Sequence, residues 1–174
     1  MIFLVYRFLI RPILFVFPPE VAHKISEMML RVRPICQLAA PVFRFRDPRL
    51  SASLCGLSLK NPIGLAAGYD KNCKVLTSLN VFGFGYIVGG TVTRFELAGN
   101  PRPRMFRIKG SESLINSLGF PNMGLDAAYM SLERVRNSIG DTRLVVSVSG
   151  TSKDDILYCY RRLEPLVDVI ELNI

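Results

Sequence analysis

The sequence contains little of what metal sites require. It has a single histidine and no tryptophan, and its four cysteines are widely scattered, with no Cys-x-x-Cys pair. Zinc sites draw on clustered histidine and cysteine side chains, so the sequence predicts no metal centre. A core of this size does not depend on disulfides, so we expect reduced thiols, with two disulfides as the alternative.

The glycines do not form a nucleotide-binding motif. Four of them cluster between residues 83 and 90, but two precede a predicted strand and two lie at its end. A dinucleotide fingerprint instead places its glycines between a strand and the next helix. The segment 64–71 has Tyr69 where a phosphate-binding loop requires its second glycine. Sites for dinucleotides and nucleoside triphosphates are therefore not predicted.

Long uninterrupted apolar runs are also lacking. Residues 1–17 are strongly apolar, but Arg7, Arg11 and Pro12 interrupt them, whereas a membrane-spanning helix needs about 20 mostly uncharged residues. A signal peptide would carry its positive charge before the apolar run. We therefore expect a helix lying in the membrane interface, with its arginines reaching toward the headgroups. The alternative is a helix packed on its own protein.

The basic excess is concentrated near the N-terminus. The net charge is +8, and the first 60 residues contain nine Lys or Arg against three acidic residues. Basic residues interleaved with Phe, Leu and Ile suit anionic lipid headgroups, each contributing on the order of 1 kcal/mol near such a surface. Nucleic acid is the competing partner, but no motif that binds it is present, so we predict no nucleic-acid binding.

Apolar runs alternate with helical patterns from residue 61 onward, which predicts parallel β/α units. The predicted strands are 63–67, 86–91, 144–149 and 167–173, and the predicted helices are 74–82, 124–138 and 153–163. Two further stretches, 99–107 and 109–113, are predicted to be loops. Before these units we expect a hairpin over 50–60, which would plug the closed end of a barrel. Before the hairpin we expect two helices, the second beginning near Pro18, which form a small cap.

Residues 61–72, with the sequence NPIGLAAGYDKN, predict the floor of a binding site. The apolar run ends in Ala66, Ala67 and Gly68, whose small side chains allow a flat ligand to lie against the backbone. Lys71 then supplies a cation at the end of the strand.

Polar side chains follow the carboxyl ends of the predicted strands, where barrel enzymes build their sites. Lys71, Thr91, Asn116 and Asn173 are therefore expected to converge on one mouth. Each has a simpler interpretation: Lys71 as a solvated lysine, Asn116 as a turn residue, and Asp70 as a helix cap.

Four segments together resemble the dihydroorotate dehydrogenase family. They are NPIGLAAGYDKN at 61–72, FGFGYIVGGTVT at 82–93, GNPRPRMFRI at 99–108 and LINSLGFPNMGLD at 114–126. The front end, PPEVAHKI at 18–25, is similar to the membrane-bound, quinone-reducing class 2 members. The resemblance implies an α/β fold, a TIM (β/α)8 barrel of which about the first half is present, with an N-terminal helical membrane-associating cap. Its implied boundaries are 1–49 for the cap and 50–174 for the half barrel.

The resemblance also implies roles for individual residues. FMN would contact Ala67, Gly68, Tyr69, Asp70, Lys71, Thr91 and Asn173. The substrate, dihydroorotate, would contact Lys71, Asn116, Ser117, Leu118, Gly119, Phe120 and Asn173. His23 and Arg107 would line the path of the quinone. An amide suits the pyrimidine because its imide edge needs a donor and an acceptor together.

Two departures from the family pattern stand out. Val148 occupies the place, two residues before Gly150, where quinone-linked members commonly have an Asn that bonds the flavin, with Ser147 or Ser149 as substitutes. The serine base of class 2 members is expected beyond Ile174, so no catalytic base is assigned within the chain. We therefore expect a truncated barrel that is inactive alone.

The implied activity is oxidation of dihydroorotate to orotate, with electrons passing through FMN to quinone, in pyrimidine biosynthesis. The implied location is peripheral, on the cytoplasmic side of the cell membrane. Another FMN-dependent barrel oxidoreductase is one alternative. A noncatalytic, membrane-tethered fragment is the other.

Overall fold

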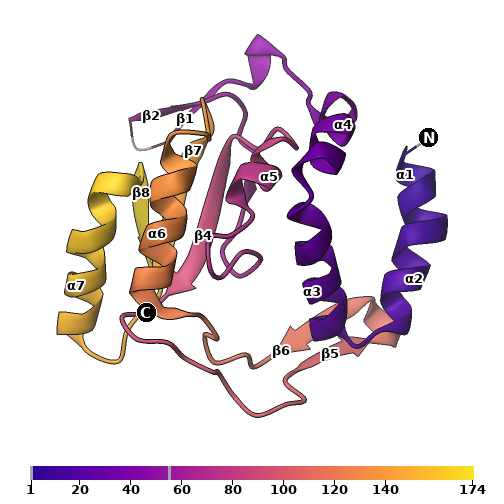
Figure 1. Cartoon of the computed structure of the whole chain (residues 1–174). Helices are drawn as coiled ribbons and strands as arrows, with labels where there is room; N and C mark the ends of the chain where they lie inside the picture. The colour runs from indigo at the N-terminus through magenta and orange to yellow at the C-terminus, as the bar shows by residue number, and fades with distance from the viewer. Residues whose placement is uncertain (1, 55) are drawn as a thin grey trace.

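A parallel sheet lies at the centre of the molecule, for which the computed structural model describes residues 2–54 and 56–174 (Figure 1). Its four strands have the order β3-β4-β7-β8, and all neighbours are parallel. The bounds are β3 (Gly64–Leu65), β4 (Tyr86–Val92), β7 (Arg143–Val148) and β8 (Val169–Leu172). β4 and β7 are buried almost throughout, as expected for inner parallel strands with few polar residues. The predicted parallel α/β arrangement is confirmed.

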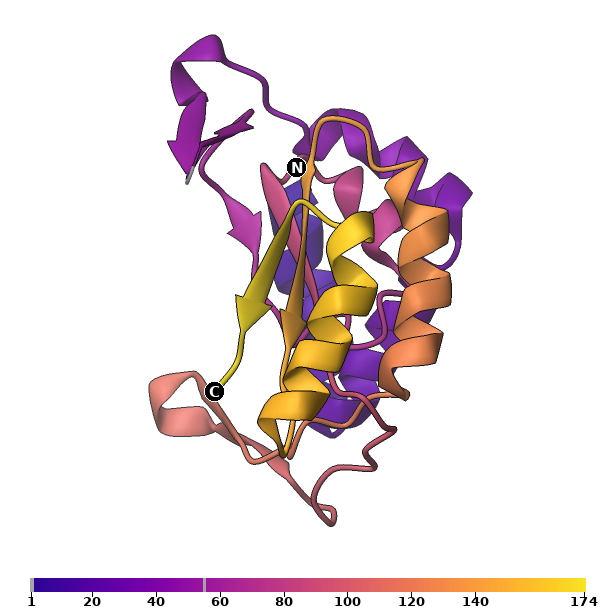
Figure 2. The same ribbon diagram turned by 90° about the vertical axis from the view of Figure 1, so that its left-hand side faces the viewer.

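Three helices cover one face of this sheet (Figure 2). They are α5 (Leu76–Asn80), α6 (Gly124–Arg136) and α7 (Lys153–Leu163), which is followed by a 3-10 turn, η4 (Glu164–Leu166). Leu76, Leu132, Leu144 and Leu163 are fully buried between the helices and the sheet. α7 has the predicted bounds because Ser152 caps it, accepting a hydrogen bond from the Asp155 amide.

Three helical segments precede the sheet. The first is a continuous run of α1 (Ile2–Val5), a π-helical turn η1 (Tyr6–Ile10) and α2 (Arg11–Val16). It is followed by α3 (Pro19–Leu30) and α4 (Arg33–Phe43). Among the described residues, no helix combines the length and apolarity needed to cross a bilayer.

The prediction of only two N-terminal helices was wrong, because α4 is a further helix. Proline usually interrupts a helix, but neither of the two prolines of α4 interrupts this one. Pro34 lies in the first turn, where its missing N–H costs nothing, and Pro41 lies in the last.

Two antiparallel hairpins flank the sheet. The hairpin predicted over 50–60 is present as β1 (Ala52–Leu54) and β2 (Leu57–Leu59), after a 3-10 turn, η2 (Pro48–Leu50). Cys55 lies outside the described residues, and the other three cysteines are free thiols. The second hairpin, β5 (Met105–Ile108) and β6 (Ser113–Asn116), joined by η3 (Lys109–Ser111), lies below the carboxyl ends of the strands in Figure 1.

The two predicted loops at 99–107 and 109–113 are therefore partly wrong. Met105 pairs with Asn116 and Ile108 with Ser113, so the backbone finds partners within the hairpin. The four intervening residues, KGSE, lack the Asn-Gly and Asp-Gly dipeptides that are the strongest sequence signal of a hairpin. Asn116 accordingly ends a strand and does not lie in a loop.

Candidate active site

The carboxyl ends of the strands open onto one cavity of about 540 Å³, here called the rim cavity. It brings together residues from α3, the segment after β3, β4, the β5–β6 hairpin, the chain after β6 and the residue after β8. Of the residues predicted from sequence it is lined by His23, Ala67, Gly68, Tyr69, Lys71, Thr91, Asn116, Leu118, Gly119, Phe120 and Asn173. The four polar groups expected to converge on one mouth do so.

The floor of the rim cavity is bare backbone. Gly68 has φ +98°, which favours glycine, and a Cβ atom placed on it would meet nothing within 4 Å. Its amide donates to the Gly90 carbonyl at 2.8 Å, which ties the floor to β4. A flat ring system could therefore lie directly against the main chain here.

Thr91 is the centre of a short polar chain beneath the floor. Its hydroxyl accepts a hydrogen bond from the Asn173 amide at 2.9 Å and shares another with the Ser147 hydroxyl at 3.1 Å. Ser147 is fully buried and Thr91 nearly so. These bonds fix the amide of Asn173 at the cavity wall.

Ser147, and not Val148, is the β7 residue on the cavity side of the sheet. Val148 is fully buried in the apolar core that faces the helices. Ser149 follows the strand and lines a separate small cavity beside Phe95. Our placement of Val148 at the cavity was therefore wrong, because the alternation of the strand turns its side chain to the opposite face.

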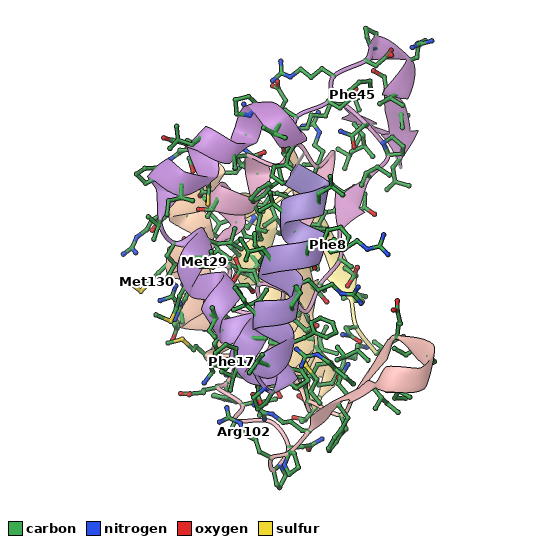
Figure 3. The ribbon with its side chains drawn as sticks, turned by 90° about the vertical axis from the view of Figure 1, so that its right-hand side faces the viewer. Phe8, Phe17, Met29, Phe45, Arg102 and Met130 are labelled. Carbon is green, nitrogen blue, oxygen red and sulfur yellow. The ribbon has the colours of Figure 1, made fainter. Side chains whose placement is uncertain are left out.

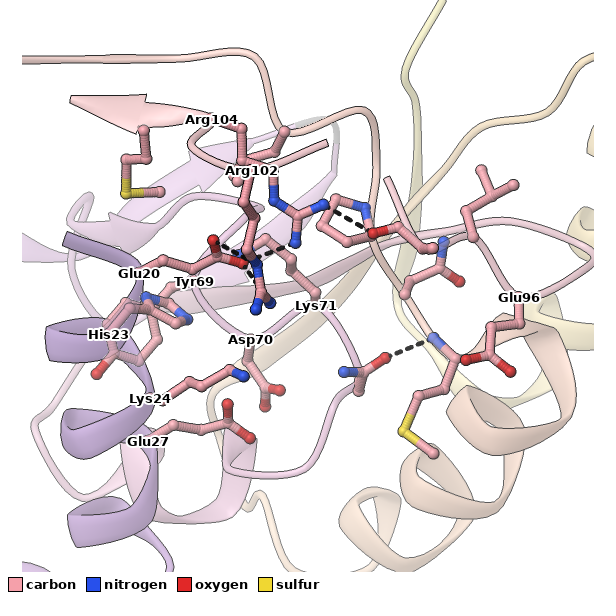
Figure 4. A pocket seen from close by; sticks show the side chains of 18 residues that line it. Glu20, His23, Lys24, Glu27, Tyr69, Asp70, Lys71, Glu96, Arg102 and Arg104 are labelled. Atoms are coloured by element: carbon pink, nitrogen blue, oxygen red, sulfur yellow. Dashed lines mark hydrogen bonds and ion pairs between the residues drawn. The ribbon is translucent and has the colours of Figure 1, made fainter. Parts of the chain in front are cut away.

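Lys71 stands between the rim cavity and a second cavity of about 370 Å³ beneath α3 (Figure 4). Glu20, Glu27 and Arg104 also line this second space, here called the charged cavity. Burial lowers the pKa of the Lys71 ammonium from its ordinary value, while the charges of Glu27 and Glu20 oppose that shift. The cation is thus held partly desolvated where it can face a ligand.

Arg104 ties α3 to the loop before β5. Its guanidinium donates to Glu20 at 2.7 Å and to the carbonyls of Ala98 and Asn100 at 2.7 and 2.9 Å, and Arg102 also pairs with Glu20. Only 6% of the Arg104 side chain is exposed. Hydrogen bonding from Arg104 lowers the pKa of the Glu20 carboxyl. This pair was not predicted, because no local pattern in the sequence indicates a contact between positions so far apart.

His23 of α3 packs on the floor segment. Its ring lies edge-on to Tyr69 with centroids 5.0 Å apart, and the Tyr69 hydroxyl shares a 2.9 Å hydrogen bond with Ser26. Burial, followed by the nearby charge of Lys71, lowers the pKa of the imidazole. A neutral ring therefore borders the rim cavity at neutral pH.

Three of the predicted residues do not line the rim cavity. Asp70 accepts hydrogen bonds from the amides of Lys74 and Val75 at 2.9 and 2.7 Å, as the helix-capping alternative anticipated. Burial raises the pKa of its carboxyl. Ser117 is fixed through its main chain, its amide donating to the Arg104 carbonyl at 3.0 Å.

Arg107 is the third of these residues, and it holds the end of α2. Its guanidinium donates to the Phe17 carbonyl at 2.7 Å and stacks 4.3 Å from the centre of the Phe15 ring. The hairpin that carries Arg107 therefore also anchors the N-terminal helical run.

Three apolar residues of the cavity lining were not predicted: Pro121, which directly follows the predicted Phe120, and two residues of the hairpin, Met105 and Leu114. In the β5–β6 register Met105 lies opposite Asn116, and Leu114 is two residues before it on the same face. Recognising the hairpin would have found both. Gly119 is required beside them because its φ is +68° and a Cβ atom there would lie 2.8 Å from the Asn100 side chain.

Fold and site together define a parallel α/β protein with a ligand cavity at the carboxyl edge of its sheet, furnished with an ammonium, two carboxamides and a hydroxyl. A family model described as dihydroorotate dehydrogenase matches residues 49–174. The chain belongs to the dihydroorotate dehydrogenase family, and that family consists of flavoenzymes.

Individual relatives agree with this assignment. Dihydroorotate dehydrogenase (quinone) of Mesorhizobium japonicum is 44% identical over 144 residues, which are 83% of this chain and 39% of that protein. The Gloeobacter violaceus protein of the same name is 40% identical, over 97% of this chain and 50% of its own length. The chain therefore spans about half the length, or less, of these relatives.

A solved structure gives the same result. The crystal structure of DHODH from Eimeria tenella in complex with ferulenol superposes with a TM-score of 0.74 at 33% identity. The match covers 90% of this chain and 44% of that one. A ligand-free structure of the same protein gives a TM-score of 0.72.

Proposed function

We propose that this chain is part of a class 2 dihydroorotate dehydrogenase, which oxidises dihydroorotate to orotate through FMN and passes the electrons to quinone in UMP biosynthesis. In this proposal residues 50–174 form the first half of a (β/α)8 barrel and residues 1–49 form its N-terminal cap. The observation that carries the proposal is the convergence of Lys71, Thr91, Asn116 and Asn173 on one cavity.

The residues present fit a flavin. The open main chain at Ala67 and Gly68 accommodates a flat ring, and the ordered hydroxyl of Thr91 and amide of Asn173 offer hydrogen-bonding partners at its edge. FMN, when bound, supplies the acceptor for the hydride that leaves the substrate. Lys71 holds its cation beside that position and favours negative charge there.

Substrate recognition is assigned to the loop and strand end opposite the floor. Asn116 presents a donor and an acceptor to the imide edge of the pyrimidine, and Leu118, Gly119 and Phe120 enclose the ring. These groups bind and orient the substrate. No residue of this chain is assigned the removal of the C5 proton, so we propose that the chain alone does not turn over.

The quinone is proposed to approach between α3 and the rim cavity. His23 borders that cavity, and Arg107 anchors the end of α2 next to it. The N-terminal helices expose many large apolar side chains, including Phe8 at 70% and Leu38 at 83%. Figure 3 shows Phe8 and Met29 on these helices. We propose that these helices rest on the membrane surface, on the cytoplasmic side, and deliver the lipid-soluble oxidant.

The test uses the longer protein that contains this chain. Lys71→Ala and Asn116→Ala should each lower orotate production by about 100-fold or more, because each removes a positioned contact to the reacting molecule. Lys74→Ala is the matched control, since Lys74 is a nearby exposed lysine that donates to Met123 and does not line the rim cavity. Wild-type turnover in both site variants would remove their assigned roles.

A further inference from the structure

A separate cationic cavity lies at the opposite, amino-terminal end of the sheet. Its volume is about 300 Å³, and it is lined in part by Arg44, Arg46, Lys60, Gly83 and Asp141. These residues lie after α4 and before β3, β4 and β7, far from the carboxyl ends that form the rim cavity. None of them enters the proposed oxidoreductase chemistry.

The cations of this cavity are held by neutral partners. Arg44 donates to the Val81 carbonyl at 3.0 Å, and Lys60 donates to the Thr142 hydroxyl at 2.7 Å. Within the described part of the chain, no ion pair involves Arg44, Arg46 or Lys60.

The acidic neighbours do not neutralise these cations. Asp47 is occupied by Arg49, whose guanidinium lies 2.6 Å from its carboxylate. Asp141 is the other acid in the lining, and it favours the charged form of Lys60. Even so, the net effect of burial and of the charges on Arg44 and Arg46 is to lower the pKa of the Lys60 ammonium. An anion in the cavity would relieve this repulsion between like charges.

Exposed apolar side chains stand beside the cavity. Phe45 is 71% exposed and lies between the two arginines in sequence, and Val42 and Phe43 at the end of α4 are also exposed. Figure 3 shows Phe45 beyond the N-terminal helices that carry Phe8 and Met29. A cationic cavity with an apolar margin matches a molecule that has a charged head and an apolar tail.

We propose that this cavity binds a phosphate group, held by Arg46 and Lys60, and that the group is the headgroup of an anionic phospholipid whose acyl chains meet Phe45. A soluble phosphate ester has the same binding chemistry. Only the choice of the lipid as source rests on the membrane association proposed above.

Vesicle binding tests the lipid source. The chain has no tryptophan, so Phe45→Trp provides a single fluorescent reporter at the cavity margin. Its emission should shift to the blue with vesicles that contain phosphatidylglycerol, and much less with phosphatidylcholine alone. Arg46→Gln and Lys60→Gln should each weaken binding to the anionic vesicles by about fivefold, the factor expected for one basic residue near such a surface.

Arg33→Gln is the matched control, because it removes one exposed positive charge from the start of α4 without touching the cavity. It should change the affinity much less than the two cavity variants, and Arg46→Lys should restore most of the binding. Equal weakening by Arg33→Gln and the cavity variants would overturn the proposal, since the attraction would then be diffuse. Far-UV circular dichroism establishes that each variant is folded.

Glycerol 1-phosphate tests the cavity without a membrane. Saturable NMR shifts of the amides around residues 45–51 and 60, lost in the Arg46→Gln, Lys60→Gln double variant, support a phosphate site. If the ester binds while both kinds of vesicle bind alike, the lipid source is wrong and the soluble source is supported. If neither ester nor anionic vesicles bind at this cavity, the proposal fails. Orotate production enters none of these measurements, so the proposed enzymatic function is tested separately.

Discussion

Ser147 shows how a buried hydroxyl can shape a site that it does not itself reach. The Ser147 hydroxyl is hydrogen-bonded to the Thr91 hydroxyl. The Thr91 hydroxyl also accepts a hydrogen bond from the side-chain amide of Asn173, and Asn173 lines the rim cavity. Counting back from Gly150 placed Val148 in this position, whereas the pleat of β7 places Ser147 there. A shift of one residue along a strand moves a side chain to the opposite face of the sheet. The spacing from a glycine beyond the strand does not show which face a given residue occupies.

The two faces of β7 can be distinguished by substitution. Val148→Asn should lower the free energy of unfolding by about 2–4 kcal/mol, because it buries an amide without partners in an apolar core. Ser147→Asn puts the same amide on the cavity side and should cost clearly less. Urea unfolding measures both. A tolerated Val148→Asn that also tightens FMN binding in the longer protein would contradict the assignment of the faces.

The sequence predicted most of the cavity lining because those residues come from two short segments, 66–71 and 116–120, that follow a strand or hairpin directly. It could not decide between the flavin contact and the helix cap for Asp70, whose carboxylate accepts from the amides of Lys74 and Val75. Nor could it show that Arg107 holds carbonyls at the end of α2, which lies about 90 positions earlier in the chain. The direction in which a side chain points and the contacts between distant segments depend on the tertiary structure, so the local sequence does not determine them.

Among the elements, the sheet strands and α7 were predictable, and α4 and the β5–β6 hairpin were not. Val- and Ile-rich runs with helical patterns between them mark β4, β7 and α7 unambiguously. Prolines obscured α4, and the Pro- and Arg-rich stretch before Met105 obscured the hairpin. Pro34 lies in the first turn of α4 and Pro103 lies before β5, positions where proline is tolerated, whereas Pro41 lies inside α4 without ending it.

The contact between α3 and the loop before β5 depends on one carboxylate. Hydrogen bonding from Arg104 lowers the pKa of Glu20 below its ordinary value near 4.5, so the folded state prefers the ionised form. The stabilisation is therefore complete above that pH and is lost as the pH falls through the lowered pKa. Glu20→Gln should cost about 1–2 kcal/mol at neutral pH, because it leaves the buried Arg104 without its anion.

The difference in the free energy of unfolding between wild type and Glu20→Gln should then become smaller in acid. Unfolding curves collected over a pH series measure this difference. Glu112→Gln is the control, since that exposed carboxylate lies 3.8 Å from Arg11 and should contribute close to nothing. A Glu20→Gln penalty that is independent of pH would show that the ion pair is not its source.

At the scale of the whole molecule, burial is distributed unevenly. β4 and β7 lie inside the core, whereas no residue of η1 or α2 is buried. Local stability follows buried apolar contact, so the N-terminal helical run should open far more often than the sheet.

Hydrogen exchange followed by mass spectrometry checks this expectation. Amides of Tyr6–Val16 should exchange much faster than those of Tyr86–Val92, and lipid vesicles should slow the first group selectively. The sheet serves as the internal control. Equal protection of the two segments in the absence of lipid would mean that the helical run is held by contacts other than those described.

The β5–β6 hairpin joins two tasks in a single ribbon. On one strand Arg107 grips the end of α2, and on the other Asn116 faces the rim cavity, with Met105 paired across from it. A displacement of the N-terminal helices would therefore shift this hairpin, and with it the Asn116 amide that is proposed to bind the pyrimidine. Substitutions that alter the contact between Arg107 and the end of α2 should therefore also displace Asn116, because one hairpin carries both residues.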